Sequence, residues 1–497
     1  MSRFAHCTAF ALCVSMVSGS FADEGADSLE FLKPTGIIYQ EITRVEKAAG
    51  YAKGLTTSEG NNKAWMEPTG GSIDFQMRKN KRLGLEVMIS AAYFVAPYHY
   101  EQNQNYTRNI AVSAPRLNAS YVFGDLAKPM LKVDFGLFSY KYDENSRNLG
   151  EYMFRTWAYP GIIQTGGVYN YAGVNGANIT GMKLSQTLGN FSHDFIVSLE
   201  TEMNPFFDLN LTYMAKYKVG DVLKVGGGVQ ISRLWSAEKD PGMKVRYFQE
   251  GGVWYAYGDE QGNEGANYYT NLEKGLVNSI RKPDATAADS ARYTADSIRV
   301  SAAPALALAI NDSVKTAQLQ PAMKSFDGMA IKPMAYFSFD PKPLFNADIF
   351  GPKDLILYGE AAILGTKNYP VFYTDITRRI PMMLGFNVPA FKLLDVFSVE
   401  MEYYRSQFLP TYPFPISLSG TPFPQTPIAY DPKDWSKDDW KWSVYAERSL
   451  FGGIMLTTQV ASDHSRSWNW DAFGKVPWEM YVKPSEWYWS AKLSAKI

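Results

Sequence analysis

The chain has 497 residues, with 49 Lys and Arg against 50 Asp and Glu, and aromatic residues make up 15% of it. A near-zero net charge excludes an extended nucleic-acid-binding surface, which needs a basic excess, and the aromatic content excludes a largely disordered chain. The mean hydropathy is −0.23 and no apolar run of about 20 residues follows residue 22, which excludes a bundle of membrane helices.

The first 22 residues have the order of a secretory signal peptide. Arg3 gives a basic start, a short and mostly apolar stretch follows, and Ser20 and Ala22 place small residues at the two positions that a signal peptidase reads. We predict cleavage after Ala22, rather than a buried N-terminal helix or lipidation at Cys13. Both cysteines, Cys7 and Cys13, lie in this segment, so the mature chain 23–497 has no thiol for a disulfide or a metal.

Along the mature chain, apolar and polar residues alternate in stretches of about 8 to 12 residues, the length of a tilted strand that crosses a bilayer. The clearest case runs from Phe207 to Lys218, turns at Gly220-Asp221 and returns from Leu223 to Ser232, which predicts a hairpin. Further alternating stretches are paired along the chain: 72–77 with 83–93, 117–123 with 131–137, 180–188 with 193–202, 330–340 with 354–364, 380–388 with 395–405, 440–447 with 453–462, and finally 487–497.

The connections between these strands sort by length. When the connections are numbered along the chain, the short ones all have the same parity, odd or even. They are 79–82, 124–129, 189–192, 219–221, 389–394 and 448–452, with a medium one at 341–353. Long connections occupy the other: 95–115, 143–179, 236–329, 365–379, 406–439 and 463–485, with one brief exception at 203–206. Membrane barrels have this asymmetry of short turns and long loops, whereas a soluble β-sandwich, the alternative that also alternates, has no reason for it.

The parity also predicts an additional strand. A bacterial barrel with both ends in the periplasm needs an even number of strands, so one strand should precede residue 72. The candidate is 36–42, which makes 47–71 the first extracellular loop. The predicted fold is all-β: a closed antiparallel transmembrane β-barrel of about 16 strands, with about 14 to 18 as the range.

One long connection, 236–329, departs from the strand pattern. Leu272, Leu276, Val277 and Ile280 have helical spacing, and 285–307 is rich in alanine, which favours helix. We therefore expect a partly helical insertion at 271–325, which caps the barrel or folds into its mouth. The alternative is an unrecognised strand at 298–310, because short apolar runs are ambiguous by period alone.

The leader, the thiol-free mature chain, the alternating strands and a strand at the C-terminus together resemble bacterial outer-membrane β-barrels of the porin type. The resemblance covers the architecture of nearly the whole mature chain and rests on no subfamily fingerprint. It implies an outer-membrane location, contact with outer-membrane lipid, and insertion by the barrel-assembly machinery. Porins of this size are often trimers, but the sequence leaves the oligomeric state open. The chain ends in Ile497 instead of the Phe or Trp which that machinery usually reads.

A barrel of about 16 strands encloses an aqueous channel, which the polar strand faces would line. The predicted pore-lining residues are Asp74, Glu86, Lys132, Asp134, Glu200, Asp208, Lys216, Lys224, Gln230, Glu360, Glu400, Glu402, Lys441, Glu447 and Lys492. The excess of carboxylates in this set suggests weak cation selectivity, unless the charges neutralise one another. Aromatic residues near strand ends are candidates for the membrane-interface girdles: Tyr93, Tyr140, Tyr213, Tyr217, Trp442 and Trp487.

The long connections are rich in aromatic residues, and four tryptophans are candidates for stacking on sugar rings. They are Trp157, Trp468, Trp470 and Trp478. The alternative is that these rings pack one loop against another and hold the mouth rigid.

The function predicted from these patterns is a passive outer-membrane channel for small hydrophilic solutes. One alternative is a surface barrel that is plugged by its loops and binds polysaccharide or a protein partner. A second is an outer-membrane hydrolase, but Asp463, His464 and Ser465 are adjacent in the chain and adjacent side chains do not converge into a triad. No catalytic, cofactor or metal motif is found, so we predict a protein that is not an enzyme.

Overall fold

The computed structural model describes the strands of the chain and part of the connections between them. The described residues are 29–48, 63, 65–95, 109–154, 177–201, 207–235, 246–250, 253–257, 268–271, 276–279, 324–325, 329–345, 348–366, 376–404, 440–469, 474–479, 481 and 484–496.

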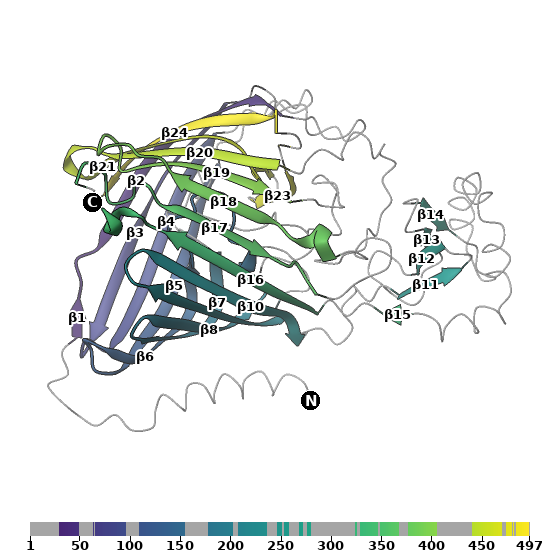
Figure 1. Ribbon diagram of the computed structural model, residues 1–497, viewed down its shortest axis with the longest axis horizontal. Coiled ribbons are helices and arrows are strands. Elements are labelled where there is room, and N and C mark those ends of the chain that lie inside the picture. The colour runs from purple at the N-terminus through teal and green to yellow at the C-terminus, as the bar shows by residue number, and fades with distance from the viewer. Residues whose placement is uncertain are drawn as a thin grey trace.

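Sixteen antiparallel strands form a sheet that closes on itself, because β2 pairs with both β3 and β24 (Figure 1). These strands are β2 (Thr35–Lys47), β3 (Trp65–Lys79), β4 (Leu83–Val95), β5 (Asn109–Gly124), β6 (Pro129–Tyr140), β7 (Ala177–Leu188), β8 (Phe191–Leu199), β9 (Leu209–Val219), β10 (Leu223–Trp235), β16 (Ala330–Phe339), β17 (Leu357–Ala362), β18 (Met382–Asn387), β19 (Val396–Tyr403), β20 (Trp440–Ser449), β21 (Ile454–Ser462) and β24 (Trp487–Lys496). The predicted fold class and number of strands are confirmed.

The strand required before residue 72 is β2, and it closes the barrel. Ile37 pairs with Lys496 and Val45 pairs with Tyr488, so the first and last barrel strands run side by side. A short strand, β1 (Leu29–Phe31), continues the sheet on the end of β3. The first long connection is shorter than the predicted 47–71, because β3 already begins at Trp65.

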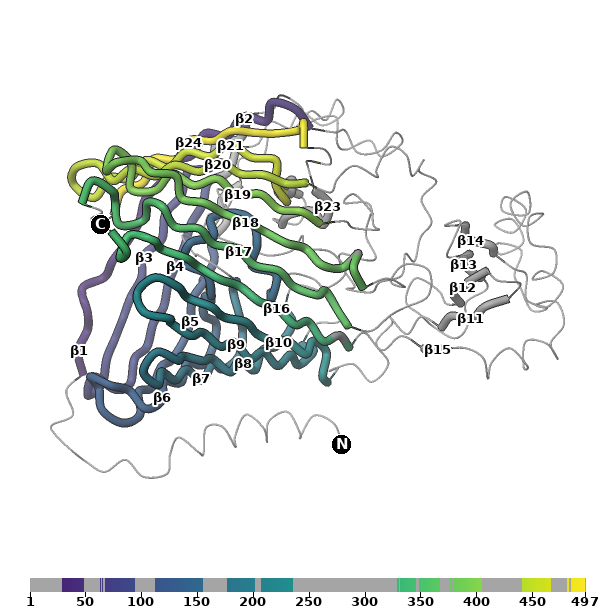
Figure 2. Tube along the Cα trace, viewed as in Figure 1, coloured from purple at the N-terminus to yellow at the C-terminus, as the bar shows by residue number. Residues whose placement is uncertain are grey.

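The connections sort by length as the parity argument predicts. Figure 2 shows the Cα trace of the strands that they join. One end of the barrel has the connections 80–82, 125–128, 189–190, 220–222, 340–356, 388–395 and 450–453. The other end has 48–64, 96–108, 141–176, 200–208, 236–329, 363–381, 404–439 and 463–486. We call these the short-turn end and the long-loop end.

Two neighbouring connections at the short-turn end are held by hydrogen bonds within them and to a strand end. The Lys342 ammonium group donates to the carbonyl oxygen of Asp354 at 2.5 Å, and Arg448 donates to the carbonyl oxygen of Lys392 at 2.7 Å. Hydrogen bonds from Ser449 hold the pKa of the Asp395 carboxyl below its usual range. The Phe391 N–H donates to the Asp354 carboxylate at 3.2 Å and thus attaches the medium connection 340–356 to the connection 388–395.

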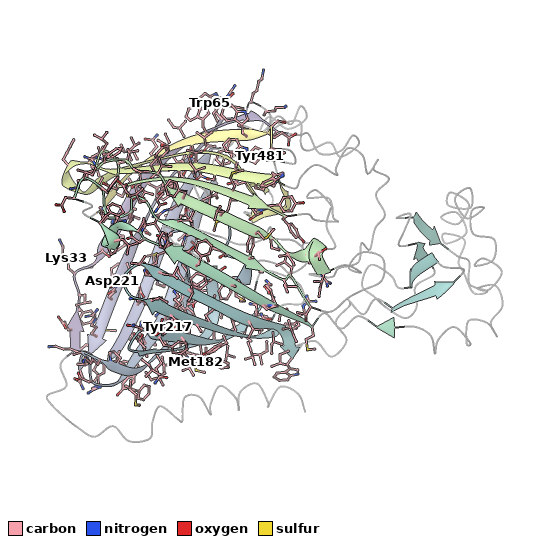
Figure 3. All side chains as sticks on the ribbon, in the orientation of Figure 1. Lys33, Trp65, Met182, Tyr217, Asp221 and Tyr481 are labelled. Carbon is pink, nitrogen blue, oxygen red and sulfur yellow. The ribbon has the colours of Figure 1, made fainter. Side chains whose placement is uncertain are left out.

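The two faces of the barrel sheet differ in polarity, and the apolar face is the outer one. On β9, Tyr213 and Tyr217 are exposed on the outside, whereas Asn210 and Thr212 are buried on the inside. The same alternation leaves large apolar side chains exposed around the outside, among them Ile38, Ile73, Ile89, Leu117, Leu384, Met401 and Leu493. Figure 3 shows the side chains on the ribbon, with Asp221 at the short-turn end and Tyr481 toward the long-loop end. We call the enclosed inner space the lumen.

Two smaller sheets lie in the long connections. One has the order β14-β13-β12-β11-β15, and the other is the pair β22–β23. Their strands are β11 (Arg246–Glu250), β12 (Val253–Tyr257), β13 (Tyr268–Asn271), β14 (Leu276–Ser279), β15 (Lys324–Ser325), β22 (Arg466–Asn469) and β23 (Gly474–Glu479).

The helical prediction for 271–325 is wrong where the structure describes that segment. Leu276 and Val277, two of the residues with helical spacing, lie on strand β14 and pair with β13. Residues 280–323, and with them the alternative strand at 298–310, lie outside the described residues. Within the described ranges the helices are single 3₁₀ turns: η2 (Tyr152–Phe154), η4 (Lys342–Leu344), η5 (Ile376–Arg379) and η6 (Phe451–Gly453). None of the helices in these ranges is long and apolar enough to cross a membrane.

Candidate functional site

The segment 141–154, which follows β6, turns into the lumen and reaches the opposite wall. In the sheet β6 pairs with β5 and β7, yet the segment forms hydrogen bonds with residues of β16, β17 and β19. Tyr142, Leu149, Tyr152 and Met153 are all buried. The segment therefore crosses the lumen, and we call it the crossing segment.

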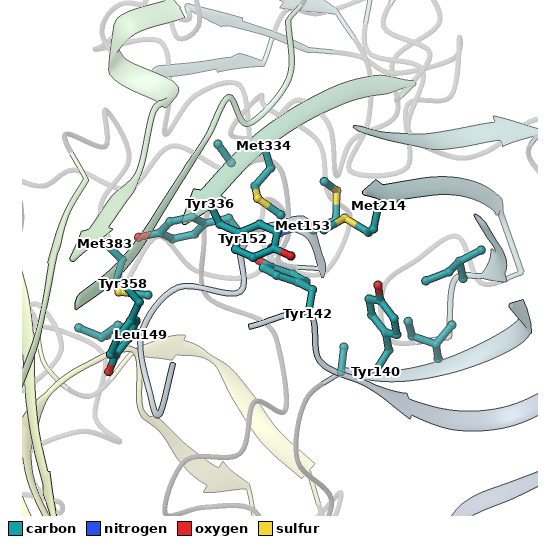
Figure 4. Packing of buried hydrophobic residues seen from close by; sticks show 14 of the residues in the cluster. Tyr140, Tyr142, Leu149, Tyr152, Met153, Met214, Met334, Tyr336, Tyr358 and Met383 are labelled. Carbon is teal, nitrogen blue, oxygen red and sulfur yellow. The ribbon is translucent and has the colours of Figure 1, made fainter. Parts of the chain in front are cut away.

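One side of the crossing segment packs into an apolar cluster, drawn in Figure 4. Met153 lies close to Met214 and Met334, which come from β9 and β16. The rings of Tyr142 and Tyr336 lie 5.7 Å apart, between the segment and β16. Burial of such side chains stabilises by about 1.5–3 kcal/mol each, so this cluster is a large part of what holds the segment inside.

Glu400 on β19 anchors the other side of the crossing segment. Its carboxylate accepts the backbone N–H groups of Arg147 at 2.5 Å and of Asn148 and Leu149 at 2.9 Å each. It also accepts the hydroxyl of Tyr358 at 2.8 Å, and Glu400 is 0% exposed. A carboxylate that accepts several N–H groups is well satisfied without a cation.

Further bonds attach the end of the segment to the wall. The ammonium group of Lys332 on β16 donates to the carbonyl oxygens of Tyr152 and Met153 at 3.0 Å each. Glu360 on β17 accepts the Tyr152 N–H at 2.8 Å, and Glu402 on β19 accepts the Tyr152 hydroxyl at 2.8 Å. The backbone and the side chain of Tyr152 are thus both bonded to the wall.

The start of the segment is bonded to β9. Lys216 donates to the carbonyl oxygen of Tyr142 at 2.7 Å. Asp143 is the next residue, and burial raises the pKa of its carboxyl. Among the described residues, no group of His, Cys, Asp and Glu has the arrangement of a metal site.

The wall of β10 is shaped to accept the cluster. A Cβ atom at Gly226 would lie 2.3 Å from Cε1 of Tyr336 and 2.7 Å from the carbonyl oxygen of Ala215. We expect Gly226→Val to lower the free energy of unfolding by about 1–3 kcal/mol, as overpacking does. Thermal unfolding in detergent, followed by the shift in gel mobility between folded and unfolded chain, measures it.

A double variant checks the cause of that loss. Tyr336→Ala removes the ring that the valine would meet, so Gly226→Val should cost less in that background than in the native one. Equal costs in the two backgrounds would assign the loss to the backbone of β9 instead of to the ring.

The sequence-predicted pore-lining residues lie on the lumenal face of the strands, with two exceptions. Glu200 and Asp208 lie in the connection between β8 and β9, where Asp208 is buried and pairs with Arg233 at 3.3 Å. Glu360, Glu400, Glu402 and Lys216 hold the crossing segment. The remaining members are spread over the rest of the lumenal wall: Asp74, Glu86, Lys132, Asp134, Lys224, Gln230, Lys441, Glu447 and Lys492.

Several of these groups are paired with cations that the sequence analysis left out. Arg116 lies 3.4 Å from Asp74 and 2.5 Å from Glu86. Lys183 lies 3.0 Å from Asp134, which also pairs with Lys132. Arg116 lies just before the predicted strand 117–123, so extending that strand by one residue would have included it. Lys183 lies inside the predicted strand 180–188, so considering every inward-facing position of that strand would have included it.

The aromatic predictions have mixed outcomes. Tyr140 is not at an interface, because its side chain is buried in the lumen and its hydroxyl donates to Asp194 at 2.7 Å. Tyr213 and Tyr217 are exposed on the outside. Trp468 and Trp478 lie on β22 and β23, whereas Trp157 and Trp470 lie outside the described residues.

The side chains of the adjacent residues Asp463 and His464 bind different partners. Asp463 accepts the side-chain amide of Asn148 at 2.6 Å and the Tyr488 hydroxyl at 2.8 Å. The His464 ring contacts Glu402. This geometry attaches the long connection 463–486 to the crossing segment and does not assemble a triad.

No family model matches the chain, and no curated protein matches it. Among solved structures, two engineered variants of the porin of Rhodopseudomonas blastica match at 7% and 8% sequence identity, each over 95% of this chain and 100% of theirs, with a TM-score of 0.38. A structure titled as Salmonella typhi OmpF in complex with daunomycin matches at 9% identity over 95% of this chain and 98% of its own, also with a TM-score of 0.38.

The chain's own architecture defines its class. Sixteen antiparallel strands, closure between the first and the last, and connections sorted by length make a closed antiparallel β-barrel with the loop asymmetry of membrane barrels. The crossing segment, which lies inside the lumen, is a further feature of this barrel.

Proposed function

We propose that this protein is a non-enzymatic passive channel of the bacterial outer membrane for small hydrophilic solutes, with its lumen narrowed by the crossing segment. The observation that carries the proposal is the polarity of the two faces: large apolar side chains are exposed outside, and polar ones face inward. A closed sheet satisfies every backbone polar group without water, which lipid demands. Cleavage after Ala22, insertion by the assembly machinery and the oligomeric state remain predictions.

Cation selectivity does not belong to this proposal. That prediction requires solutes to meet the carboxylates on which it rests. Asp134, Glu360, Glu400 and Glu402 are all buried, and each has a hydrogen-bonding or ion-pairing partner. Buried carboxylates that already accept hydrogen bonds do not offer a direct binding site to a passing cation.

Ion conductance of the purified full-length chain in planar bilayers tests the proposal. We expect discrete conductance steps that grow in proportion to KCl concentration and have a nearly linear current–voltage relation, as for a water-filled pore. Heat-unfolded protein from the same preparation is the control. Folded, inserted protein that never conducts above the lipid baseline would refute the proposed channel.

One observation favours a second candidate, the barrel that is plugged and binds polysaccharide through its loops. Lumenal residues away from the crossing segment are also buried, among them Thr43 on β2, Gln459 on β21 and Ser490 on β24. Two results together would support this candidate. The native barrel would not conduct, and its retention on immobilised polysaccharide would be lost in Trp468→Ala and Trp470→Ala.

A further inference from the structure

On the lumenal wall formed by β3 to β10, the carboxylates are bonded to cations or to a hydroxyl, and one of the paired lysines is well exposed. The Lys132 side chain is 46% exposed, whereas that of Asp134, its partner at 3.0 Å, is 4% exposed. Asp74 and Glu86 share Arg116, and Asp194 accepts the Tyr140 hydroxyl. These carboxylates are therefore already bonded, whereas the Lys132 ammonium group is accessible to a solute.

Lys218 and Lys224 form an exposed part of this wall, beside the short turn 220–222. They stand directly opposite each other in the register of β9 and β10, and both are exposed. Although Asp221 lies in the turn between them, neither lysine forms an ion pair with a carboxylate of the described residues. Like charges directly opposite each other on a sheet are destabilising, and an anion between them would remove that repulsion.

The excess of positive charge extends beyond this pair. Apart from the buried Arg233 at the far end, seven cationic side chains share the lumenal face of β3 to β10: Arg78, Arg116, Lys132, Lys183, Lys216, Lys218 and Lys224. Four carboxylates share it: Asp74, Glu86, Asp134 and Asp194. The wall thus has three positive charges in excess, and Lys and Arg linings are those of anion and phosphate pores.

We propose that this wall is a binding surface for small polyvalent anions, with Lys218 and Lys224 as its central pair. The proposal rests on the proposed channel, because it names the class of solute that the lumen favours. Both ammonium groups act as point charges, so they suit phosphate- or carboxylate-bearing solutes without fixing one geometry. Because the lysines are exposed, binding should weaken as salt rises and the Debye length falls to about 3 Å at 1 M.

The test uses the full-length chain and the double variant Lys218→Glu with Lys224→Glu. Inorganic tripolyphosphate is the probe, and its binding to the detergent-solubilised barrel is measured by titration calorimetry at low salt. We expect binding at least about tenfold weaker in the variant, because repulsion replaces attraction at both positions. The native channel should also show anion preference in its reversal potential across a KCl gradient, and the variant should shift that potential toward K⁺.

The matched control is Lys81→Glu with Lys128→Glu. These lysines are exposed in the turns 80–82 and 125–128 at the same end of the barrel, and the change in net charge is identical. Equal loss of tripolyphosphate binding in the control would overturn the proposal, as would no binding by the native chain. If the native barrel does not conduct, the proposed channel fails, but the calorimetric comparison still decides whether the wall binds anions.

Discussion

Replacement of Glu400 by alanine should release the crossing segment and raise the single-channel conductance several-fold. Three backbone N–H groups and the Tyr358 hydroxyl lose their acceptor at once in a fully buried position. Each buried donor left unsatisfied costs about 1–3 kcal/mol, so the segment is more stable where water can reach it. Planar-bilayer recordings measure the conductance, and thermal unfolding measures the accompanying loss of stability.

Two variants separate the anchoring role of Glu400 from a general effect of lumenal charge. Glu86→Ala also removes a lumenal carboxylate, but Glu86 pairs with Arg116 on another wall, so its conductance should stay near the native value. Glu400→Gln keeps one acceptor oxygen and should fall between native and alanine. A folded Glu400→Ala barrel with native conductance would show that the apolar cluster and the remaining bonds hold the segment without Glu400.

Much of the barrel could be predicted from the sequence because its determinants are local. Alternation with period 2 and tight turns set the hairpin from Leu209 to Trp235, which forms as predicted. The candidate strand at 36–42 alternates poorly in the polarity of its residues, but the even-number rule required a strand there, and β2 forms at Thr35–Lys47. The start of β3 was missed because Pro68, Gly70 and Gly71 interrupt the pattern, and pairing with β2 and β4 determines it instead.

The crossing segment could not be predicted, because its position depends on contacts distant in sequence. Arg147 and Glu400 are 253 residues apart, and Lys332 is 180 residues from Tyr152. Nothing within 141–154 shows that its backbone will meet a carboxylate across the lumen. The helix predicted around Leu276 is wrong for a related reason. The spacing of apolar residues in this short stretch fits either a helix or short strands, and only the pairing of β14 with β13 decides between the two.

The contacts of the crossing segment also change the role of the inward-facing charges. From the sequence, Glu360, Glu400 and Glu402 are three carboxylates facing a pore. In the structure they are acceptors for the crossing segment, so they are not available as direct ligands for a passing solute. The charges that remain accessible, such as Lys218 and Lys224, are those without such a structural role.

A second large effect should follow from a charge on the outer face. Ile89 is the seventh of the 13 residues of β4, and its side chain is 48% exposed on the outside. If lipid surrounds this face, Ile89→Arg places a guanidinium near the bilayer midplane and should lower the free energy of unfolding by about 2–4 kcal/mol. Reversible denaturant unfolding of the barrel inserted in phospholipid vesicles measures this difference.

The control must be equally exposed and equally apolar but outside the hydrocarbon. Leu126 meets these conditions, because it is 42% exposed and lies in the turn 125–128 at the short-turn end. Leu126→Arg should cost about 0–1 kcal/mol, as charges near the interface do. In detergent-free water, where no hydrocarbon is present, the native barrel should aggregate through the face that carries Ile89. If Ile89→Arg and Leu126→Arg cost the same in vesicles, the outer face does not contact lipid, and the placement of this barrel in a membrane would be refuted.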